Sequence, residues 1–527
     1  MKNGMLERVI ENWLTNTDER GYQIPFCQLL TLKGHKVVHV STHGPFEQGK
    51  DILTIDPKGV PCAFQLKVGN IPLSRWRTIR SEVDELLDIP INHPSIPQKT
   101  QHKSYFVTTG SLTDPVRREI DDRNAQRNRD NKPLLSTIVK GELLQEFYSA
   151  SGGFLPQEIA DIQLFLNLYT SEGTYPLPKE RFAHFLSIIC PLEGRYDRRT
   201  LTKLAASSLI FAAYVLSPYE QARNHWSLSD GWIINTAYLL ALAEKYNAYE
   251  YLKPTIDLAI SSAERSLTDL QEESLKSPDL IQNGIFDGIF YPFRATILCG
   301  YLTAYRLYLL LKGAEDWCDD QIISFCQKYE GDFNLFGEGA IPFLLSLFWY
   351  LVKTSNSEIA RNVLMKVIST IVHESRKQKV GLINPYYEIE TAIRHQMGLV
   401  DEPITESFVG KSYFLSSLVS IAAKYGLRDY LASQWRSISH MQFTEFKPGS
   451  SWETFLYRVE HGQVESRFPN QTQSWAKLVE EANEIDASEI PSVFTNYPQF
   501  AILLFLVFPH RMRPVYIKFL DRAINEA

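Results

Sequence analysis

Three residues near the start of the chain carry side chains that together could hydrolyse a phosphodiester bond. They are Asp51, Gln65 and Lys67, in the segments GKDILTID and FQLKV. A carboxylate and a second oxygen ligand bind Mg²⁺, a hard cation that keeps several waters and also takes phosphate oxygens. A neighbouring lysine can orient or help to deprotonate the attacking water while the metal stabilises charge on the phosphate. These residues predict a metal-dependent hydrolytic site, with Asp51 and Gln65 as the metal ligands.

The stretch GPFEQGKD (44–51) has a competing interpretation, because G-x-x-x-x-G-K is most of a phosphate-binding loop. Such a loop needs Ser or Thr after the lysine to hold magnesium, and a helix whose first amides face the phosphates. Here Asp51 follows Lys50, and the next residues, ILTID, are typical of a strand. Both features argue against a nucleotide site.

The elements that must position these side chains alternate along the first 150 residues. Apolar residues at helical spacing predict helices over residues 6–14, 22–32, 73–89, 113–128 and from 141 onward. Segments rich in β-branched and aromatic residues predict strands over residues 35–42, 51–56, 60–68, 104–110 and 134–139. The residues DPKG (56–59) suit a tight turn, so the second and third strands should form a hairpin. Because residues two apart on a strand face the same side, this hairpin would bring Asp51 to Gln65 and Lys67.

The order of these segments resembles that of the PD-(D/E)xK nucleases, and most closely the Mrr-type restriction endonucleases. Over roughly residues 5–147 the chain has, in the order of that branch, QLLTLKGHKVV, QGKDI, FQLK, YFVTTGSLT and TIVKGELL. The resemblance implies an α/β restriction-endonuclease-like domain over residues 1–150. It also implies that Asp51, Gln65 and Lys67 are catalytic, and that Asp51 and Gln65 bind Mg²⁺, or Mn²⁺ in its place.

Two positions depart from the pattern of that branch. Many members have a glutamate on the first helix about 11 residues before the strand glycine; at that offset from Gly34 stands Gln23, with Glu19 one turn earlier. The helix carboxylate is therefore either Glu19 or absent. Gln65 replaces the commoner acidic residue, which lowers the negative charge at the metal, and Glu47 in the preceding loop could compensate for it.

Basic residues after the Gln-x-Lys segment are candidates for contacts with DNA. Arg75, Arg77 and Arg80 flank Trp76 on the predicted helix 73–89, where they could meet a phosphate backbone; a solvated charged face is the alternative. A second basic run is interrupted by acidic residues, and salt bridges within its helix explain it better: Arg117, Arg118, Arg123, Arg127 and Arg129. His43 could touch the substrate, although an ordinary surface histidine is the favoured interpretation.

Beyond a Ser/Gly/Pro-rich stretch at 149–156 the sequence predicts a large all-α region over residues 155–527, with a second boundary near 330. Residues 1–150 hold 20 Lys/Arg and 18 Asp/Glu, a balance of +2, whereas the other 377 hold 34 and 43, a balance of −9. A polyanion therefore belongs with the first part. The acidic helical part suits a regulator that recognises a protein partner or another copy of the chain.

Three features indicate a cytoplasmic protein that does not enter a membrane. Glu7 and Glu11 interrupt the apolar run that an export signal would need. The six cysteines are scattered, as buried thiols of a reducing compartment are. The longest apolar runs, at 340–352 and 500–508, are shorter than the ~20 residues of a membrane-spanning helix and predict buried core helices.

Together these features predict an Mg²⁺-dependent endonuclease of double-stranded DNA whose helical region regulates it, an arrangement that by resemblance suits restriction or antiphage defence. Two alternatives stay open. One is a nuclease for repair or mobile-element processing. The other is a catalytically inactive nuclease fold that serves as a nucleic-acid-binding module or scaffold.

Overall fold

The chain forms two compact units. The computed structural model describes residues 2–41, 49–97, 100–151, 158–276, 287–329, 333–375, 381–399, 408–457 and 462–527. The first unit comprises Met1–Leu239 and Ala248–Ser266, and the second comprises Leu240–Asn247 and Leu267–Ala527. The first unit thus continues past the boundary predicted near 150, and the boundary predicted near 330 falls inside the second.

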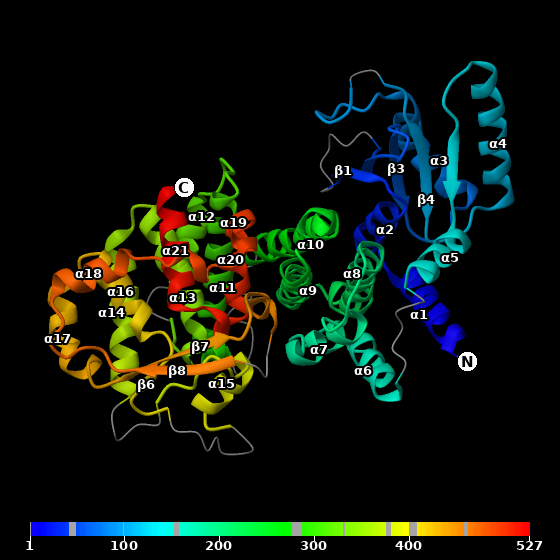
Figure 1. Cartoon of the computed structure of the whole chain (residues 1–527). Coiled ribbons are helices and arrows are strands. Elements are labelled where there is room, and N and C mark those ends of the chain that lie inside the picture. The colour runs from blue at the N-terminus through cyan, green and yellow to red at the C-terminus, as the bar shows by residue number, and fades with distance from the viewer. Residues whose placement is uncertain are drawn as a thin grey trace. The chain divides into compact units, whose positions relative to one another are not determined.

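A mixed five-stranded sheet forms the centre of the α/β region in the first unit (Figure 1). Its strands lie in chain order: β1 (Lys36–Val40), β2 (Ile52–Ile55), β3 (Pro61–Lys67), β4 (Lys103–Thr108) and β5 (Leu135–Ile138). The pairs β1–β2 and β2–β3 are antiparallel, whereas β3–β4 and β4–β5 are parallel. All five predicted strands and the predicted hairpin are confirmed.

The turn of that hairpin is held by its own first residue. Asp56 Oδ1 accepts hydrogen bonds from the backbone N of Lys58 (2.9 Å) and of Val60 (2.8 Å). Gly59 has φ +80°, a left-handed conformation in which glycine meets no steric penalty. The turn sets the register Ile55↔Pro61 to Ile52↔Phe64. Asp51, just before β2, therefore comes opposite Gln65.

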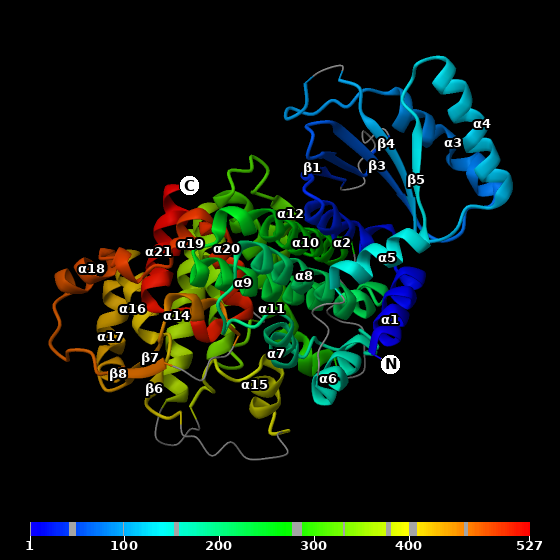
Figure 2. The same cartoon turned by 45° about the vertical axis from the view of Figure 1, so that its right-hand side comes forward.

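Helices cover both faces of the sheet: α1 (Lys2–Asn16), α2 (Glu19–Leu32), α3 (Leu73–Asp88), α4 (Asp114–Arg129) and α5 (Lys140–Ser151). Figure 2 shows α3 and α4 side by side on one face, where they share a buried core with Ala63 of β3. On the other face Phe64 meets Phe26 of α2, with ring centroids 5.6 Å apart. Because neighbouring strand residues face opposite ways, Gln65 and Lys67 lie on the α3 side with Ala63.

The five predicted helices of this region are confirmed, with one local difference. Thr113, a residue type that commonly caps helices, stands at the N-cap position of α4, but its side chain makes no capping hydrogen bond. Its hydroxyl is buried and has no hydrogen-bond partner. Pro115 in the first helical turn, where a missing N–H costs nothing, is the remaining start signal.

The rest of the first unit is helical: α6 (Ile159–Tyr169), α7 (Lys179–Ile189), α8 (Arg198–Gln221), α9 (His225–Tyr246) and α10 (Tyr249–Lys276), the last two also supplying residues of the second unit. Among the residues described, α8 alone is long and apolar enough to cross a membrane. In its most apolar stretch 83% of the residues are buried, as they are in core helices.

The second unit is mainly helical: α11 (Asp287–Leu311), α12 (Asp320–Lys328), α13 (Ile341–Lys353), α14 (Ser357–Glu374), α15 (Ile389–Gln396), α16 (Leu415–Lys424), α17 (Arg428–Ile438), α18 (Trp475–Asn483), α19 (Ser492–Asn496), α20 (Pro498–Val507) and α21 (Pro514–Glu526). The runs at 340–352 and 500–508 form the buried helices α13 and α20, as predicted.

The prediction of an all-α region is wrong in one respect, because the second unit also contains a three-stranded sheet. Its strands are β6 (Lys411–Ser412), β7 (Gln442–Pro448) and β8 (Gly462–Arg467). The buried residues of β7 include Phe443 and Phe446, which are three apart, and in β8 the apolar residue Val464 is 67% exposed. Neither strand has the alternation by which half-buried strands are recognised.

Candidate active site

The hairpin brings together the three residues from which a hydrolytic site was predicted. Asp51 precedes β2, and its backbone N donates to Phe64 O of β3 (2.8 Å). Its carboxylate Oδ2 accepts a hydrogen bond of 2.6 Å from the backbone N of Leu66. Leu66 stands between Gln65 and Lys67, so the carboxylate lies at the strand end that carries both.

Glu19, the candidate helix carboxylate, lies beside Lys67. It is the first residue of α2, which begins there because the N-cap Asp18 accepts a hydrogen bond of 2.7 Å from Gly21 N. Glu19 Oε2 lies 3.5 Å from Lys67 Nζ. Gln23, the residue at the expected offset, is buried, and its amide donates to the backbone oxygens of Ser41 (3.3 Å) and Asp51 (3.4 Å). Of the two alternatives, the structure therefore favours Glu19.

A third carboxylate, which was not predicted from the sequence, reaches the site from α3. Glu82 Oε2 lies 2.7 Å from Gln65 Nε2 and 3.2 Å from Lys67 Nζ. One signal could have revealed it. The helix that follows the Gln-x-Lys strand packs on the sheet face that carries Gln65 and Lys67, and Glu82 adjoins the apolar stripe of that helix at Ile79 and Val83.

Glu82 determines which way the Gln65 amide points. A carboxylate only accepts hydrogen bonds, so the amide nitrogen must face Glu82. Gln65 Oε1 is then left buried without a hydrogen-bond partner. Such an oxygen is uncommon, because an unsatisfied buried acceptor costs about 1–3 kcal/mol. An unpaired amide oxygen on the strand residue opposite Asp51 is of the kind that Mg²⁺ prefers as a ligand, so the residue types fit the expected cation.

The described residues contain no group of three or more His, Cys, Asp or Glu side chains arranged to hold a metal ion. The donor set predicted at the hairpin is of a different kind, since a carboxylate and an amide oxygen would be its only protein ligands and water would complete the coordination, as Mg²⁺ sites commonly allow.

The surroundings of Lys67 keep it positively charged. Burial lowers its pKa, but Glu19, Glu82 and Asp51 together outweigh that effect, so its pKa is raised above the ordinary value. Tyr22 of α2 donates its hydroxyl to Lys67 O (3.0 Å). Burial, assisted by Glu19 and Asp51, raises the pKa of Tyr22 well above its ordinary value. Lys67 is therefore an ammonium group that can stabilise negative charge, on a backbone that α2 holds in place.

The end of the GPFEQGKD stretch has a structural role. Residues 42–48, which include His43 and Glu47, lie outside the described residues. Gly49 has φ +69°, and a Cβ there would overlap the backbone oxygen of Glu82. Lys50 is buried and donates to Glu85 O (3.1 Å), and burial lowers its pKa to about 8. Because Lys50 is anchored to α3 and a strand follows, the nucleotide interpretation is not supported.

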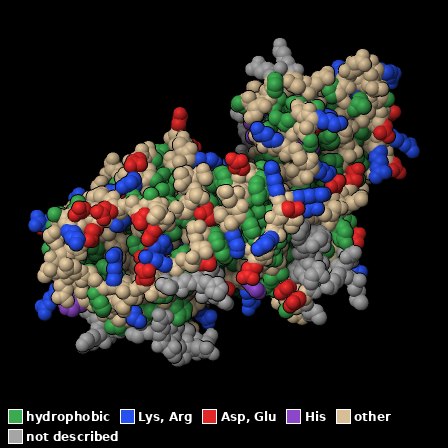
Figure 3. Space-filling model, in the orientation of Figure 1, with side chains coloured by type: hydrophobic (Ala, Val, Ile, Leu, Met, Phe, Trp, Pro, Cys, Tyr) green, Lys and Arg blue, Asp and Glu red, His purple; other side chains and the backbone are tan. Residues whose placement is uncertain are grey.

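The three arginines predicted to contact DNA differ in their surroundings. Arg75 donates Nη1 to Val68 O (2.6 Å), directly after β3. Arg80 Nη1 lies 3.1 Å from Glu119 Oε1, and Arg77 is exposed. Trp76 between them is fully buried against Phe106. Basic and acidic side chains are interspersed on the face drawn in Figure 3. A role of these arginines in DNA binding stays a prediction.

The salt bridges predicted within α4 are instead made between helices. Arg123 pairs with Asp84 of α3, and Arg127 Nη1 lies 2.8 Å from Asp88 Oδ1 of the same helix. Because α3 and α4 lie side by side on the sheet, carboxylates of α3 are within reach of the α4 arginines. The intrahelical explanation is therefore wrong for these residues.

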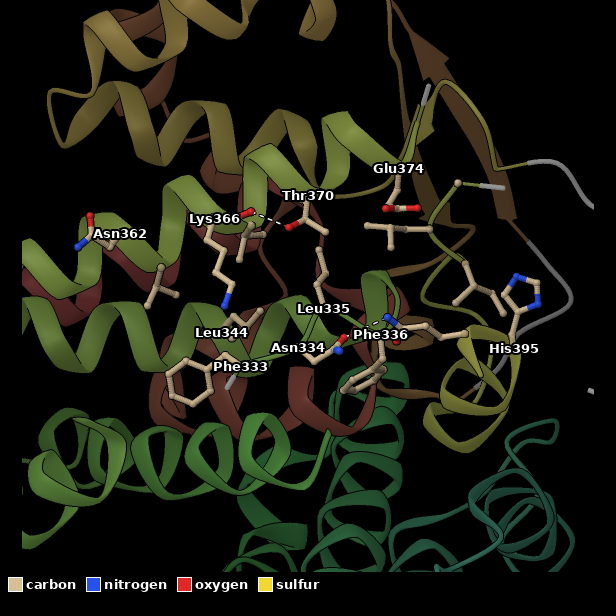
Figure 4. Close-up of a pocket in the computed structure, with 16 residues that line it drawn as sticks. Phe333, Asn334, Leu335, Phe336, Leu344, Asn362, Lys366, Thr370, Glu374 and His395 are labelled. Carbon is tan, nitrogen blue, oxygen red and sulfur yellow. Dashed lines mark hydrogen bonds between the residues drawn. The ribbon is translucent and has the colours of Figure 1, made fainter. Parts of the chain in front are cut away.

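A cavity of about 460 Å³ lies in the second unit, and none of the predicted site residues lines it (Figure 4). Lys366 and Thr370 of α14 face the loop that contains Phe333 and Asn334. Asn334 Oδ1 accepts a hydrogen bond of 3.2 Å from Gln396 Nε2. The residues that line the cavity include a carboxylate, Glu374, a lysine, Lys366, and side-chain amides such as Asn334, but none of the residues from which a hydrolytic site was predicted. The hairpin site is therefore the candidate active site.

No protein-family model matches this chain, and no curated protein or solved structure shows significant similarity to it.

Proposed function

We propose that the first unit is an Mg²⁺-dependent endonuclease of double-stranded DNA, regulated by the helical part of the protein. The observation that carries the proposal is the convergence of Glu19, Asp51, Gln65, Lys67 and Glu82 from α2, the β2–β3 hairpin and α3. The resemblance in sequence supports the same reaction, and it suggests restriction or antiphage defence in the cytoplasm as the setting.

Each side chain has a part in this proposal. Asp51 and Gln65 would hold the Mg²⁺. When bound, this ion stabilises negative charge on the phosphate and lowers the pKa of a water molecule that it binds. Leu66 N fixes the Asp51 carboxylate, and Glu82 fixes the Gln65 amide. Lys67 places a positive charge where the phosphate gains negative charge, and such preorganised charge is usually a large part of catalysis.

The order of the elements gives further support. The resemblance implies a helix, a strand, a hairpin that ends in Gln-x-Lys, two further strands and a closing helix. The chain has α2, β1, β2–β3, β4, β5 and α5 in that order. The sheet brings the end of β3 beside the helix that carries Glu19, as a shared site requires.

A plasmid-cleavage assay with Mg²⁺ or with EDTA tests the proposal. We expect metal-dependent cutting by the wild type, and a loss of at least about 100-fold in Asp51→Ala and Lys67→Ala. Lys58→Ala is the matched control, because Lys58 is an exposed lysine in the hairpin turn. Equal cutting by all variants would exclude this site. If the purified wild type is inactive, toxicity in cells that Lys67→Ala removes would indicate a latent enzyme.

A nucleic-acid-binding protein without cleavage is the second candidate, and one observation favours it. Lys67 Nζ already has two carboxylates within 3.5 Å, Glu19 and Glu82, which would compete with a phosphate for it. DNA binding that is equally tight with Mg²⁺ and with EDTA, together with no cleavage or toxicity, would support this function. A repair or mobile-element nuclease would use the same site, and neighbouring genes would distinguish it from defence.

A further inference from the structure

Helix α2 has one face toward the candidate site. Glu19, Tyr22 and Gln23 are spaced i, i+3 and i+4, so they lie on one side of the helix. Glu19 reaches Lys67 Nζ, Tyr22 donates to Lys67 O, and Gln23 donates to Asp51 O. Three side chains of the first turns of α2 thus contact the two hairpin residues with the strongest roles in the proposed reaction.

The opposite face of the same turn is held by two helices that follow the α/β region. Arg265 of α10 donates Nη1 to Arg20 O (3.0 Å), and its Nη2 lies 3.3 Å from Glu220 Oε1 of α8. Gly21 lies against the side chains of Thr17 and of Glu220 from α8, because a Cβ there would be 2.3 Å from Thr17 Oγ1 and 2.7 Å from Glu220 Oε2. All of these residues belong to the first unit.

These contacts suit their location at a helix start. Glu220 brings a carboxylate to the N-terminal end of α2, where the helix dipole favours negative charge. Arg265 joins that carboxylate to a backbone oxygen of α2, and its planar fork can bond two acceptors at once. The side chains of Arg265 and Glu220 are only 22% and 25% exposed, so solvent competes with these bonds less than at an open surface.

We propose that Glu220 and Arg265 are positioning residues for the candidate site. They hold the first turn of α2 on the side that faces α8 and α10, so that Glu19 on the other side reaches Lys67. The inference rests on the proposed function and adds the route by which the helical part regulates it. Arg265 is two residues before Leu267, where the chain of α10 enters the second unit. A displacement of α10 would therefore move the backbone that carries Glu19.

The test compares full-length variants in two assays, DNA cleavage and amide hydrogen exchange of α2. In Arg265→Ala we expect kcat to fall about tenfold with KM for DNA unchanged, because small displacements of catalytic groups slow the chemical step. We also expect amides 20–24 to exchange about tenfold faster. Arg265→Lys should recover part of both, since lysine can keep one of the two bonds.

Lys253→Ala is the matched control, because Lys253 is on α10 in an exposed pair with Asp257 (2.9 Å). It should leave both readouts unchanged. Gly21→Ala supplies an independent variant, since its methyl group would overlap Thr17 Oγ1 and Glu220 Oε2 and so displace the Glu220 carboxylate from the start of α2 without removing a charge. It should lower kcat as Arg265→Ala does.

Two results would overturn the inference. One is unchanged exchange of α2 in Arg265→Ala, and the other is faster exchange with unchanged kcat in an active enzyme. The proposed function fails separately, if the wild type neither cuts nor depends on Asp51 and Lys67. Exchange of α2 is measured without cleavage, so the two failures are distinguishable.

Discussion

Glu82 Oε2 lies 2.7 Å from Gln65 Nε2, and this hydrogen bond holds the amide nitrogen of Gln65 toward α3 while its buried carbonyl oxygen has no hydrogen-bond partner. The sequence offers Gln65 as a neutral replacement for an acidic ligand. The structure adds a carboxylate that does not replace the missing charge on the strand but orients the amide that stands there.

Glu82→Gln should weaken metal binding about 10- to 100-fold, the usual effect of losing a group that orients a metal ligand. A neutral amide at position 82 would no longer require the Gln65 nitrogen to face it. Calorimetric titration of the full-length protein with Mn²⁺ measures the affinity. Glu85→Gln on the same helix is the charge-matched control: it keeps the backbone oxygen that accepts from Lys50 and removes only the carboxylate charge, which acts on Lys50 and has no described contact with Gln65. Equal affinities in both variants would show that Glu82 does not orient Gln65.

Gly49→Ala should destabilise the protein more than Gly59→Ala does. Both glycines have positive φ, 69° and 80°, so each alanine pays about 1 kcal/mol or more for its backbone conformation. At Gly49 the new Cβ would also overlap Glu82 O, whereas at Gly59 it would meet no described atom within 4 Å. Urea unfolding should show the difference. Cleavage should fall only in Gly49→Ala, because α3 and Glu82 must move.

Arg127→Ala should lower the free energy of unfolding by about 2–4 kcal/mol, since a buried guanidinium with several partners is lost. Arg127 is 7% exposed and donates to Pro133 O (2.7 Å) and Asp88 Oδ1 (2.8 Å), which joins α4 to α3 and to the loop before β5. Arg129→Ala, an exposed arginine two residues on, should change it by less than about 0.5 kcal/mol. Similar values for the two variants would contradict this account.

The stability of the second unit should depend on pH through Glu338. This carboxyl is fully buried and accepts hydrogen bonds from Ser412 Oγ and from Tyr413 N (2.6 Å), and burial raises its pKa from 4.5 to about 7. The folded state therefore holds a proton that the unfolded state releases between these two values. The protonated form contributes its stability below pH 4.5, and that contribution is lost as the pH rises through 7.

The loss amounts to about 3 kcal/mol at 1.4 kcal/mol per pKa unit. Urea unfolding of the wild type and Glu338→Gln at pH 5 and pH 8 checks it, because the glutamine variant cannot titrate at this position. The fall in stability between the two pH values should be about 3 kcal/mol smaller in the variant. An equal fall in both proteins would place the pH dependence elsewhere.

The parts of the site that sequence could predict are those that local chain geometry determines. Asp51, Gln65 and Lys67 are brought together by a single hairpin, whose turn residues and alternating strands are visible in DPKG and FQLK. Their meeting needs no knowledge of how distant elements pack. The element order around the sheet was predictable for the same reason, since each segment carries its own periodicity and end signals.

What could not be predicted depends on how helices pack. Glu82 reaches Gln65 only because α3 lies at one particular position along the sheet, and Arg123 and Arg127 find Asp84 and Asp88 only because α4 lies beside α3. The contact between Arg265 and Arg20 joins residues 245 apart in the chain. The sheet of the second unit escaped prediction because β7 and β8 lack alternating apolar residues.

The hairpin has a consequence for how the site assembles during folding. Asp51, Gln65 and Lys67 belong to one hairpin, which forms by closing a single short loop. This hairpin can therefore form early and independently of the chain that follows. Glu19 and Glu82 arrive only when α2 and α3 dock on the two faces of the sheet. Until then Lys67 lacks two of its three carboxylate neighbours, so the environment of its ammonium group is a natural reporter of the docking step.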